Sequence, residues 1–190
     1  MFDRDRFIAE CQDAASRNAT DDNAIRGAVR DILARAVAEP AAVLRGLGEP
    51  SRAGIDVLYR SNQITVVNLV WGQRMSIMPH NHNMWALIGI YTGREDNIFW
   101  RRTPGAGPRE ITAAGARSLC AGDVDVLGRD IIHSVLNPID RLTGAIHIYG
   151  GDFVAAERSQ WDAENLREKP FDHAEARRLF EEANIGPGRA

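Results

Sequence analysis

The sequence has few of the features that mark secreted, membrane or disulfide-stabilised proteins. It contains only two cysteines in 190 residues, Cys11 and Cys120, which are too few for a disulfide framework. No stretch approaches the roughly 18 apolar residues of a membrane-spanning helix. The charged segment Met1–Glu10 lacks the apolar core of a secretory signal. We therefore expect a cytoplasmic protein with no membrane partner.

An excess of positive charge is also missing. The formal net charge is −3, so the chain offers no basic surface of the kind that nucleic acid requires, and we expect no nucleic-acid partner. The length of 190 residues is sufficient for one domain with a substantial core. We predict a single domain over residues 1–190, with an N-terminal helical segment (1–50), a β-barrel (51–155) and a C-terminal tail that contains a helix (156–190).

Hydrophobic spacing predicts helices at both ends and strands between them. Apolar residues recur at the helical period from Ile25 to Ala36, and Asp21 is one candidate N-cap. A second amphipathic pattern covers residues 172–183. Runs of β-branched and aromatic residues, separated by glycine-containing turns, cover residues 55–59, 64–71, 84–91, 97–102, 110–112, 123–127, 132–135 and 144–149. Many short strands without intervening helices predict a mainly β fold, an antiparallel sandwich or barrel.

Three of the five histidines form a candidate metal site. His80 and His82 are two residues apart, a spacing that places both rings on one face of a strand, and His133 follows on a distant strand. Met78 and Met84 are spaced by even numbers of residues from these histidines, so they are expected on the same face of the chain and indicate apolar surroundings. Imidazoles buried in such surroundings need a partner. Because imidazole binds several first-row metals, we predict that His80, His82 and His133 hold a metal ion. Met78 and Met84 are predicted to line the adjoining substrate pocket.

Residues 55–150 resemble the cupin superfamily. His80, His82 and Gly93 match its first motif, and His133 lies in a segment that matches its second. The resemblance implies a cupin double-stranded β-helix, a jelly-roll barrel, with N-terminal helices and a C-terminal helix around it. The motif's carboxylate ligand is replaced by Ala86 or by its neighbour, depending on the spacing, which leaves three neutral histidines.

A cupin with three histidines and no carboxylate resembles the thiol dioxygenases, the family of cysteine dioxygenase. Arg60, after a tyrosine, is similar to an arginine that holds the substrate carboxylate in that family. Ala145, His147 and Tyr149 resemble a relay in which the histidine orients a catalytic tyrosine hydroxyl, although Ala145 replaces the family's outer serine. The resemblance implies an oxidoreductase that uses Fe(II) and O2 to convert a small thiol carboxylate to its sulfinate. The alternatives to Arg60 are Arg74, Arg101 and Arg102.

Two other classes of function stay open. The same three histidines could serve a metal-dependent cupin enzyme that acts on a non-thiol substrate, either a dioxygenase or an isomerase that uses Zn or Ni. A non-catalytic cupin that binds a metal or a small ligand is the third class. The expected partners are a small-molecule substrate and O2, and the sequence carries no signal for an oligomeric state.

Overall fold

Three helices precede the strands in the computed structural model, which describes residues 2–103 and 110–185. They are α1 (Arg4–Arg17), α2 (Asp22–Val37) and α3 (Pro40–Leu47). Asp21 is the N-cap of α2, because its side chain accepts hydrogen bonds from the backbone N–H groups of Asn23 and Ala24. The apolar stripe predicted from the sequence is the buried face of this helix.

The strands form two antiparallel sheets. Within the described ranges, the orders are β1-β2-β9-β4-β7 in one sheet and β11-β10-β3-β8-β5-β6 in the other. Apart from the β5–β6 and β10–β11 hairpins and the neighbours β1 and β2, successive strands alternate between the sheets. This is the predicted double-stranded β-helix. The bounds are β1 (Gly54–Arg60), β2 (Thr65–Trp71), β3 (Ser76–Asn81), β4 (Ala86–Thr92), β5 (Arg94–Arg102), β6 (Ile111–Cys120), β7 (Val124–Leu127), β8 (Ile132–Leu136), β9 (Thr143–Tyr149), β10 (Ser159–Trp161), β11 (Glu168–Pro170) and, after the strands, α4 (His173–Ala183).

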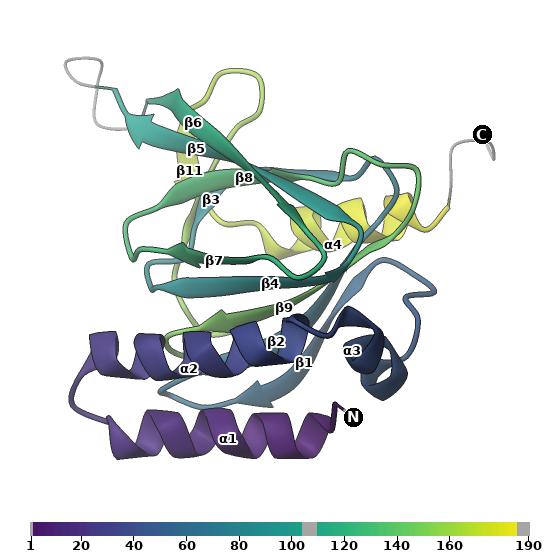
Figure 1. Ribbon diagram of the computed structural model, residues 1–190. Coiled ribbons are helices and arrows are strands. Elements are labelled where there is room, and N and C mark those ends of the chain that lie inside the picture. The colour runs from purple at the N-terminus through teal and green to yellow at the C-terminus, as the bar shows by residue number, and fades with distance from the viewer. Residues whose placement is uncertain (1, 104–109, 186–190) are drawn as a thin grey trace.

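The five-stranded sheet is covered on both faces, as Figure 1 shows, with the N-terminal helices below it and the second sheet above it. Alternate side chains of β9 therefore enter two different cores. Ile146 and Ile148 pack with residues of α1 and α2, whereas Ala145 and Tyr149 face the barrel interior. Trp85, whose position in the chain alternates with those of the ligand histidines, packs in the core between this sheet and the helices. The inward face of β9 can thus carry functional side chains.

Two segments differ from the sequence prediction. β6 continues to Cys120, far beyond the predicted residues 110–112, because this mostly exposed edge strand lacks an apolar alternation. The segment predicted as a tail contributes β10 and β11, and Gln160 of β10 pairs with His80. Both cysteines are free, with Cys11 buried and Cys120 exposed. No helix in the described ranges has the length and hydrophobicity needed to cross a membrane.

Candidate metal centre and cavity

The three histidines selected from the sequence meet inside the barrel. His80 on β3 is directly opposite His133 on β8, and His82 follows the end of β3. The Nε2 atom of His82 lies 3.2 Å from that of His80 and 3.3 Å from that of His133. Two imidazole nitrogens bound to one tetrahedral zinc ion would be about 3.3 Å apart. The spacing therefore fits a group that shares one cation.

Their protonation state also fits a metal ion. Burial lowers the pKa of His80 to about 4 and holds those of His82 and His133 well below the ordinary value of 6.5, so all three rings are neutral at pH 7. Nδ1 of His80 lies 3.0 Å from the carbonyl oxygen of Met78, and Nδ1 of His133 lies 2.6 Å from Oδ1 of Asn97. These two Nδ1 atoms therefore carry the ring protons, and the Nε2 lone pairs of His80 and His133 are directed at Nε2 of His82. Such lone pairs repel one another unless a cation lies among them.

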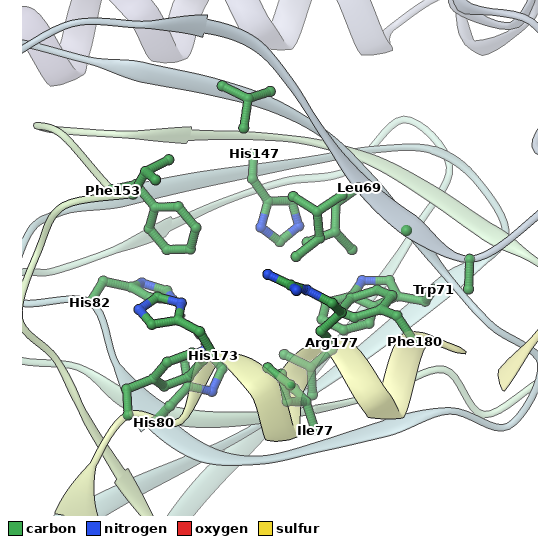
Figure 2. Close-up of a pocket in the computed structure, with 18 of the residues that line it drawn as sticks. Leu69, Trp71, Ile77, His80, His82, His147, Phe153, His173, Arg177 and Phe180 are labelled. Atoms are coloured by element: carbon green, nitrogen blue, oxygen red, sulfur yellow. Dashed lines mark hydrogen bonds between the residues drawn. The ribbon is translucent and has the colours of Figure 1, made fainter. Parts of the chain in front are cut away.

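A cavity of about 360 Å³ adjoins the three histidines. It extends from the barrel interior to β1 and α4, and Figure 2 shows His80, His82 and His147 pointing toward it. Its walls are mainly apolar, and the wall residues of the two sheets include Leu69, Trp71, Ile77 and Val135, with Phe180 added by α4. The site is therefore a largely apolar pocket with polar groups at the metal end and charged side chains, such as Arg177, on α4, an arrangement typical of small-molecule sites.

Met78 and Met84, predicted to line the substrate pocket, are absent from the walls of this cavity. A β-bulge between Ile77 and His80 shifts the register of β3 against β8, so that Ile77 and His80 face the same side although they are three residues apart. Ile77 lines the cavity, whereas Met78 and Met84 do not. Pro79 lies within the bulge, where its missing N–H does not interrupt a ladder. The sequence prediction assumed that residues two apart share one face of a strand. That assumption fails for Met78, because β3 has one extra residue at the bulge.

His147 and Tyr149 both line the cavity and contact each other. Nδ1 of His147 lies 3.1 Å from the Tyr149 hydroxyl, and the Tyr149 ring centroid is 5.1 Å from that of His82. The second nitrogen of His147, Nε2, lies 3.3 Å from Oε2 of Glu95. His147 is therefore in contact with a carboxylate. The serine hydroxyl expected from the resemblance is absent, because residue 145 is alanine.

Glu95 was missed from the sequence, and it is completely buried. Its carboxylate also accepts hydrogen bonds from Nε1 of Trp71 at 2.6 Å and from Nδ2 of Asn97 at 2.9 Å. Burial raises the pKa of Glu95, but its hydrogen bonds with His147, Asn97 and Trp71 outweigh the effect of burial and leave the pKa below its ordinary value. The predicted strand 97–102 began after Glu95, so the sequence did not pair Glu95 with Asn97. On β5 the two residues are two apart and therefore share one face.

Arg60, predicted to bind the substrate carboxylate, lies outside this cavity. Its guanidinium is half-exposed and bonded to Asp152 by two contacts of 2.7 and 2.8 Å, and it does not line the cavity. The three alternatives named from the sequence, Arg74, Arg101 and Arg102, do not line it either. Arg60 follows a register shift between Val57 and Tyr59 on β1, and a shift of one residue moves a side chain to the other face.

Arg158, unlike Arg60, lines the cavity. It is only 8% exposed, and its guanidinium carbon lies 4.1 Å from the ring centroids of both Phe153 and Phe171. Its Nε atom is buried and has no hydrogen-bond partner among the described residues. Burial lowers the pKa of Arg158 to about 10, so the side chain is still charged at neutral pH. Sequence reasoning missed it because it follows Ala155, in the polar stretch interpreted as a tail.

Comparison with known proteins yields structural likenesses. No family model matches the chain. A cupin family protein from Methanocaldococcus jannaschii is similar over 56% of this chain and 86% of its own, with 8% identity and a TM-score of 0.46. A cupin superfamily protein from Desulfitobacterium hafniense DCB-2 is similar over 57% of this chain and 88% of its own, with 15% identity and a TM-score of 0.44. The DMSP lyase of Ruegeria pomeroyi DSS-3 is similar over 56% of this chain and 50% of its own, with 16% identity and a TM-score of 0.43.

Proposed function

We propose that the protein is a non-haem Fe(II) dioxygenase that resembles cysteine dioxygenase and oxidises a thiol carboxylate with O2. Both oxygen atoms are added to sulfur, so that the thiolate R–S⁻ becomes the sulfinate R–SO2⁻. The observation that carries the proposal is the pairing of three neutral histidines, whose ligand atoms lie close together, with a buried arginine whose Nε has no hydrogen-bond partner among the described residues, in one cavity. Together they offer one site for a thiolate and one for a carboxylate.

The three histidines provide the thiolate end. Because His80, His82 and His133 are neutral, they contribute no negative charge, and a divalent cation among them keeps its full attraction for an anionic group. A nearby cation also lowers the pKa of a thiol and favours the thiolate. Iron(II) bound there would supply the redox chemistry that joins O2 to sulfur. The donor set also accepts Zn or Ni.

Arg158 provides the carboxylate end. A guanidinium forms two parallel hydrogen bonds with a carboxylate, and a carboxylate would satisfy the Nε atom that otherwise lacks a partner. The rings of Phe153 and Phe171 both contact the guanidinium. They also link it to the centre, because Phe153 stacks on Tyr149 at 3.8 Å and Phe171 lies 5.9 Å from His80. Besides burial, the charge of Arg158 contributes to the lowered pKa values of His80 and His82, which supports a substrate that contacts both groups.

Tyr149 and His147 would orient the reacting groups. When Nε2 of His147 donates to Glu95, its Nδ1 accepts a hydrogen bond from the Tyr149 hydroxyl, so the hydroxyl oxygen is held at the cavity wall beside His82. The apolar walls exclude water, and proximity of sulfur and oxygen is then the protein's main contribution to the rate.

The size of the cavity favours one second candidate. Its volume of about 360 Å³ lies within the range of about 300–1,000 Å³ typical of sites for drug-sized ligands, and exceeds what a cysteine-sized molecule fills. A metal-dependent cupin enzyme that acts on a larger, non-thiol carboxylate would use the same histidines and Arg158. The apolar walls would contact the body of that substrate.

Oxygen consumption distinguishes the two candidates. Protein loaded with Fe(II) should consume O2 with cysteine, 3-mercaptopropionate or a longer thiol carboxylate, and mass spectrometry should detect the sulfinate. Matched hydroxy acids, in which oxygen replaces sulfur, should be inert, and thiols without a carboxylate should react poorly. Turnover of non-thiol substrates alone would support the second candidate. Metal retention without turnover of any compound would contradict both.

A further inference from the structure

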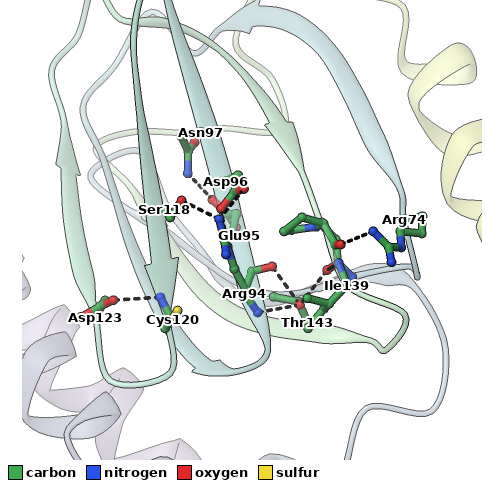
Figure 3. Close-up of polar contacts among 12 residues, drawn as sticks. Arg74, Arg94, Glu95, Asp96, Asn97, Ser118, Cys120, Asp123, Ile139 and Thr143 are labelled. Atoms are coloured by element: carbon green, nitrogen blue, oxygen red, sulfur yellow. Dashed lines mark hydrogen bonds and ion pairs between the residues drawn. The ribbon is translucent and has the colours of Figure 1, made fainter.

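Glu95 collects three hydrogen-bond donors from three different strands. Trp71 on β2, Asn97 on β5 and His147 on β9 all donate to its two carboxylate oxygens, and none of these four side chains is more than slightly exposed. Figure 3 shows the bond between Asn97 and Glu95. Trp71 and His147 share Oε2, while Asn97 uses Oε1. Both oxygens must therefore act as acceptors, which a carboxylate does and an amide does not.

One branch of this network leads to a metal ligand. The amide of Asn97 has two distinct ends, and its NH2 group is directed to Glu95 because a carboxylate only accepts. Its carbonyl oxygen Oδ1 therefore faces Nδ1 of His133, at 2.6 Å. That contact requires the proton on Nδ1 and leaves Nε2 of His133 free as a metal ligand. A reversed amide would place the proton on Nε2 and block this ligand.

The other branch leads to Tyr149. Glu95 attracts the proton of His147 to Nε2, and Nδ1 then accepts the hydroxyl hydrogen bond of Tyr149. Without an acceptor at Glu95, the proton of His147 could move to Nδ1, and the direction of the hydrogen bond with Tyr149 would reverse. The two branches thus end at two groups beside the same cavity, His133 and Tyr149.

We propose that Glu95 is a positioning residue that fixes the direction of every hydrogen bond between itself and the metal centre. Through Asn97 it selects the ring tautomer in which His133 binds a metal, and through His147 it orients the Tyr149 hydroxyl. The second role rests on the proposed function, whereas the first depends only on a metal being bound. The buried carboxylate supports metal binding without being a ligand, as the outer partners of ligand histidines do.

The test compares wild type with E95Q, and D125N is the matched control. Asp125 is also a buried barrel acid, but it is bonded to Arg117 and to the backbone of Val126 rather than to Asn97 or His147. Zn²⁺ affinity is measured by competition with a chromogenic chelator, and the ring tautomers are read from imidazole ¹⁵N spectra of metal-free protein. We expect E95Q to bind Zn²⁺ roughly tenfold more weakly and to show altered tautomers at His133 and His147. D125N should match wild type in both measurements.

Unchanged tautomers together with wild-type Zn²⁺ affinity in E95Q would overturn the proposal. If circular dichroism shows that E95Q is unfolded, N97A decides instead, because it removes only the branch to His133. N97A should weaken Zn²⁺ binding while the tautomer of His147 stays as in wild type, and wild-type affinity in N97A would refute the inference. Neither measurement uses turnover. A protein that oxidises no thiol but responds in this way would refute the proposed function and leave the role of Glu95 intact.

Discussion

Oδ1 of Asn97 and Nδ1 of His133 lie 2.6 Å apart inside the barrel, and they come from adjacent strands of the same sheet. This contact fixes the proton of His133 on the nitrogen that faces away from the other two histidines. The ring is therefore set for metal binding before any ion arrives, since the remaining nitrogen, Nε2, is directed at His82.

Removing this ligand should remove the metal without unfolding the protein. His133→Ala leaves two of the three nitrogens, and we expect elemental analysis of purified protein to find little metal, with the far-ultraviolet circular dichroism unchanged. His173→Ala is the control, because His173 is exposed and outside the histidine triad. Full metal occupancy in His133→Ala would show that the ligand assignment is wrong.

The two arginines named for carboxylate binding can be compared directly. Arg158→Gln should lower kcat/KM for a thiol carboxylate by roughly 10- to 100-fold, because a hydrogen bond to a charged group contributes about 1.5–3 kcal/mol. Arg60→Gln should leave kcat/KM unchanged, since Arg60 binds Asp152 outside the cavity. Steady-state oxygen uptake measures both variants. A larger loss in Arg60→Gln than in Arg158→Gln would reverse the assignment.

The hydroxyl of Tyr149 should affect turnover rather than metal binding. Tyr149→Phe keeps the ring that stacks on Phe153 but removes the oxygen near His147. We expect wild-type iron content and a kcat lowered about tenfold or more. Tyr91→Phe is the matched control, because the Tyr91 hydroxyl donates to Asn68 and is absent from the cavity wall. Equal rates for Tyr149→Phe and wild type would exclude Tyr149 from the mechanism.

Stability of the metal-free protein should fall in acid. His80 has its pKa lowered from 6.5 to about 4 in the folded state, so between these values the unfolded state binds more protons. The free energy of unfolding therefore decreases as pH falls from 6.5 toward 4, by about 3 kcal/mol from His80 alone. His82 and His133 shift in the same direction. Urea unfolding at pH 7.5 and pH 5 measures this, and His80→Gln should reduce the difference. A pH-independent midpoint would contradict the burial of neutral rings.

Close packing at Gly144 gives a prediction about the barrel itself. A Cβ at this position on β9 would overlap the ring of Tyr91, and Gly144→Ala should destabilise the protein by about 1–3 kcal/mol. Gly115→Ala on the exposed strand β6 is the control, because a Cβ there meets nothing within 4 Å. Thermal unfolding compares the two variants, and equal melting temperatures would show that Tyr91 moves aside without cost.

The sequence by itself determined the helices, most strands and the three histidines. These depend on periods of 3.6 and 2 and on spacings within short segments, so that His80 and His82 could be paired before any fold was known. The double-stranded β-helix and the pairing of His147 with Tyr149 came from the resemblance to cupins, whose motifs are also short segments of sequence.

Only the tertiary structure decided which other side chains reach these groups. The bulge before His80 exchanged Met78 for Ile77, and a register shift on β1 accompanies the outward position of Arg60. Arg158 approaches the site from the loop just before β10, and Glu95 approaches it from β5. Their positions depend on how strands pair and how the sheets face each other. Local periodicity carries no information about that pairing, because one inserted residue changes the face of every side chain that follows.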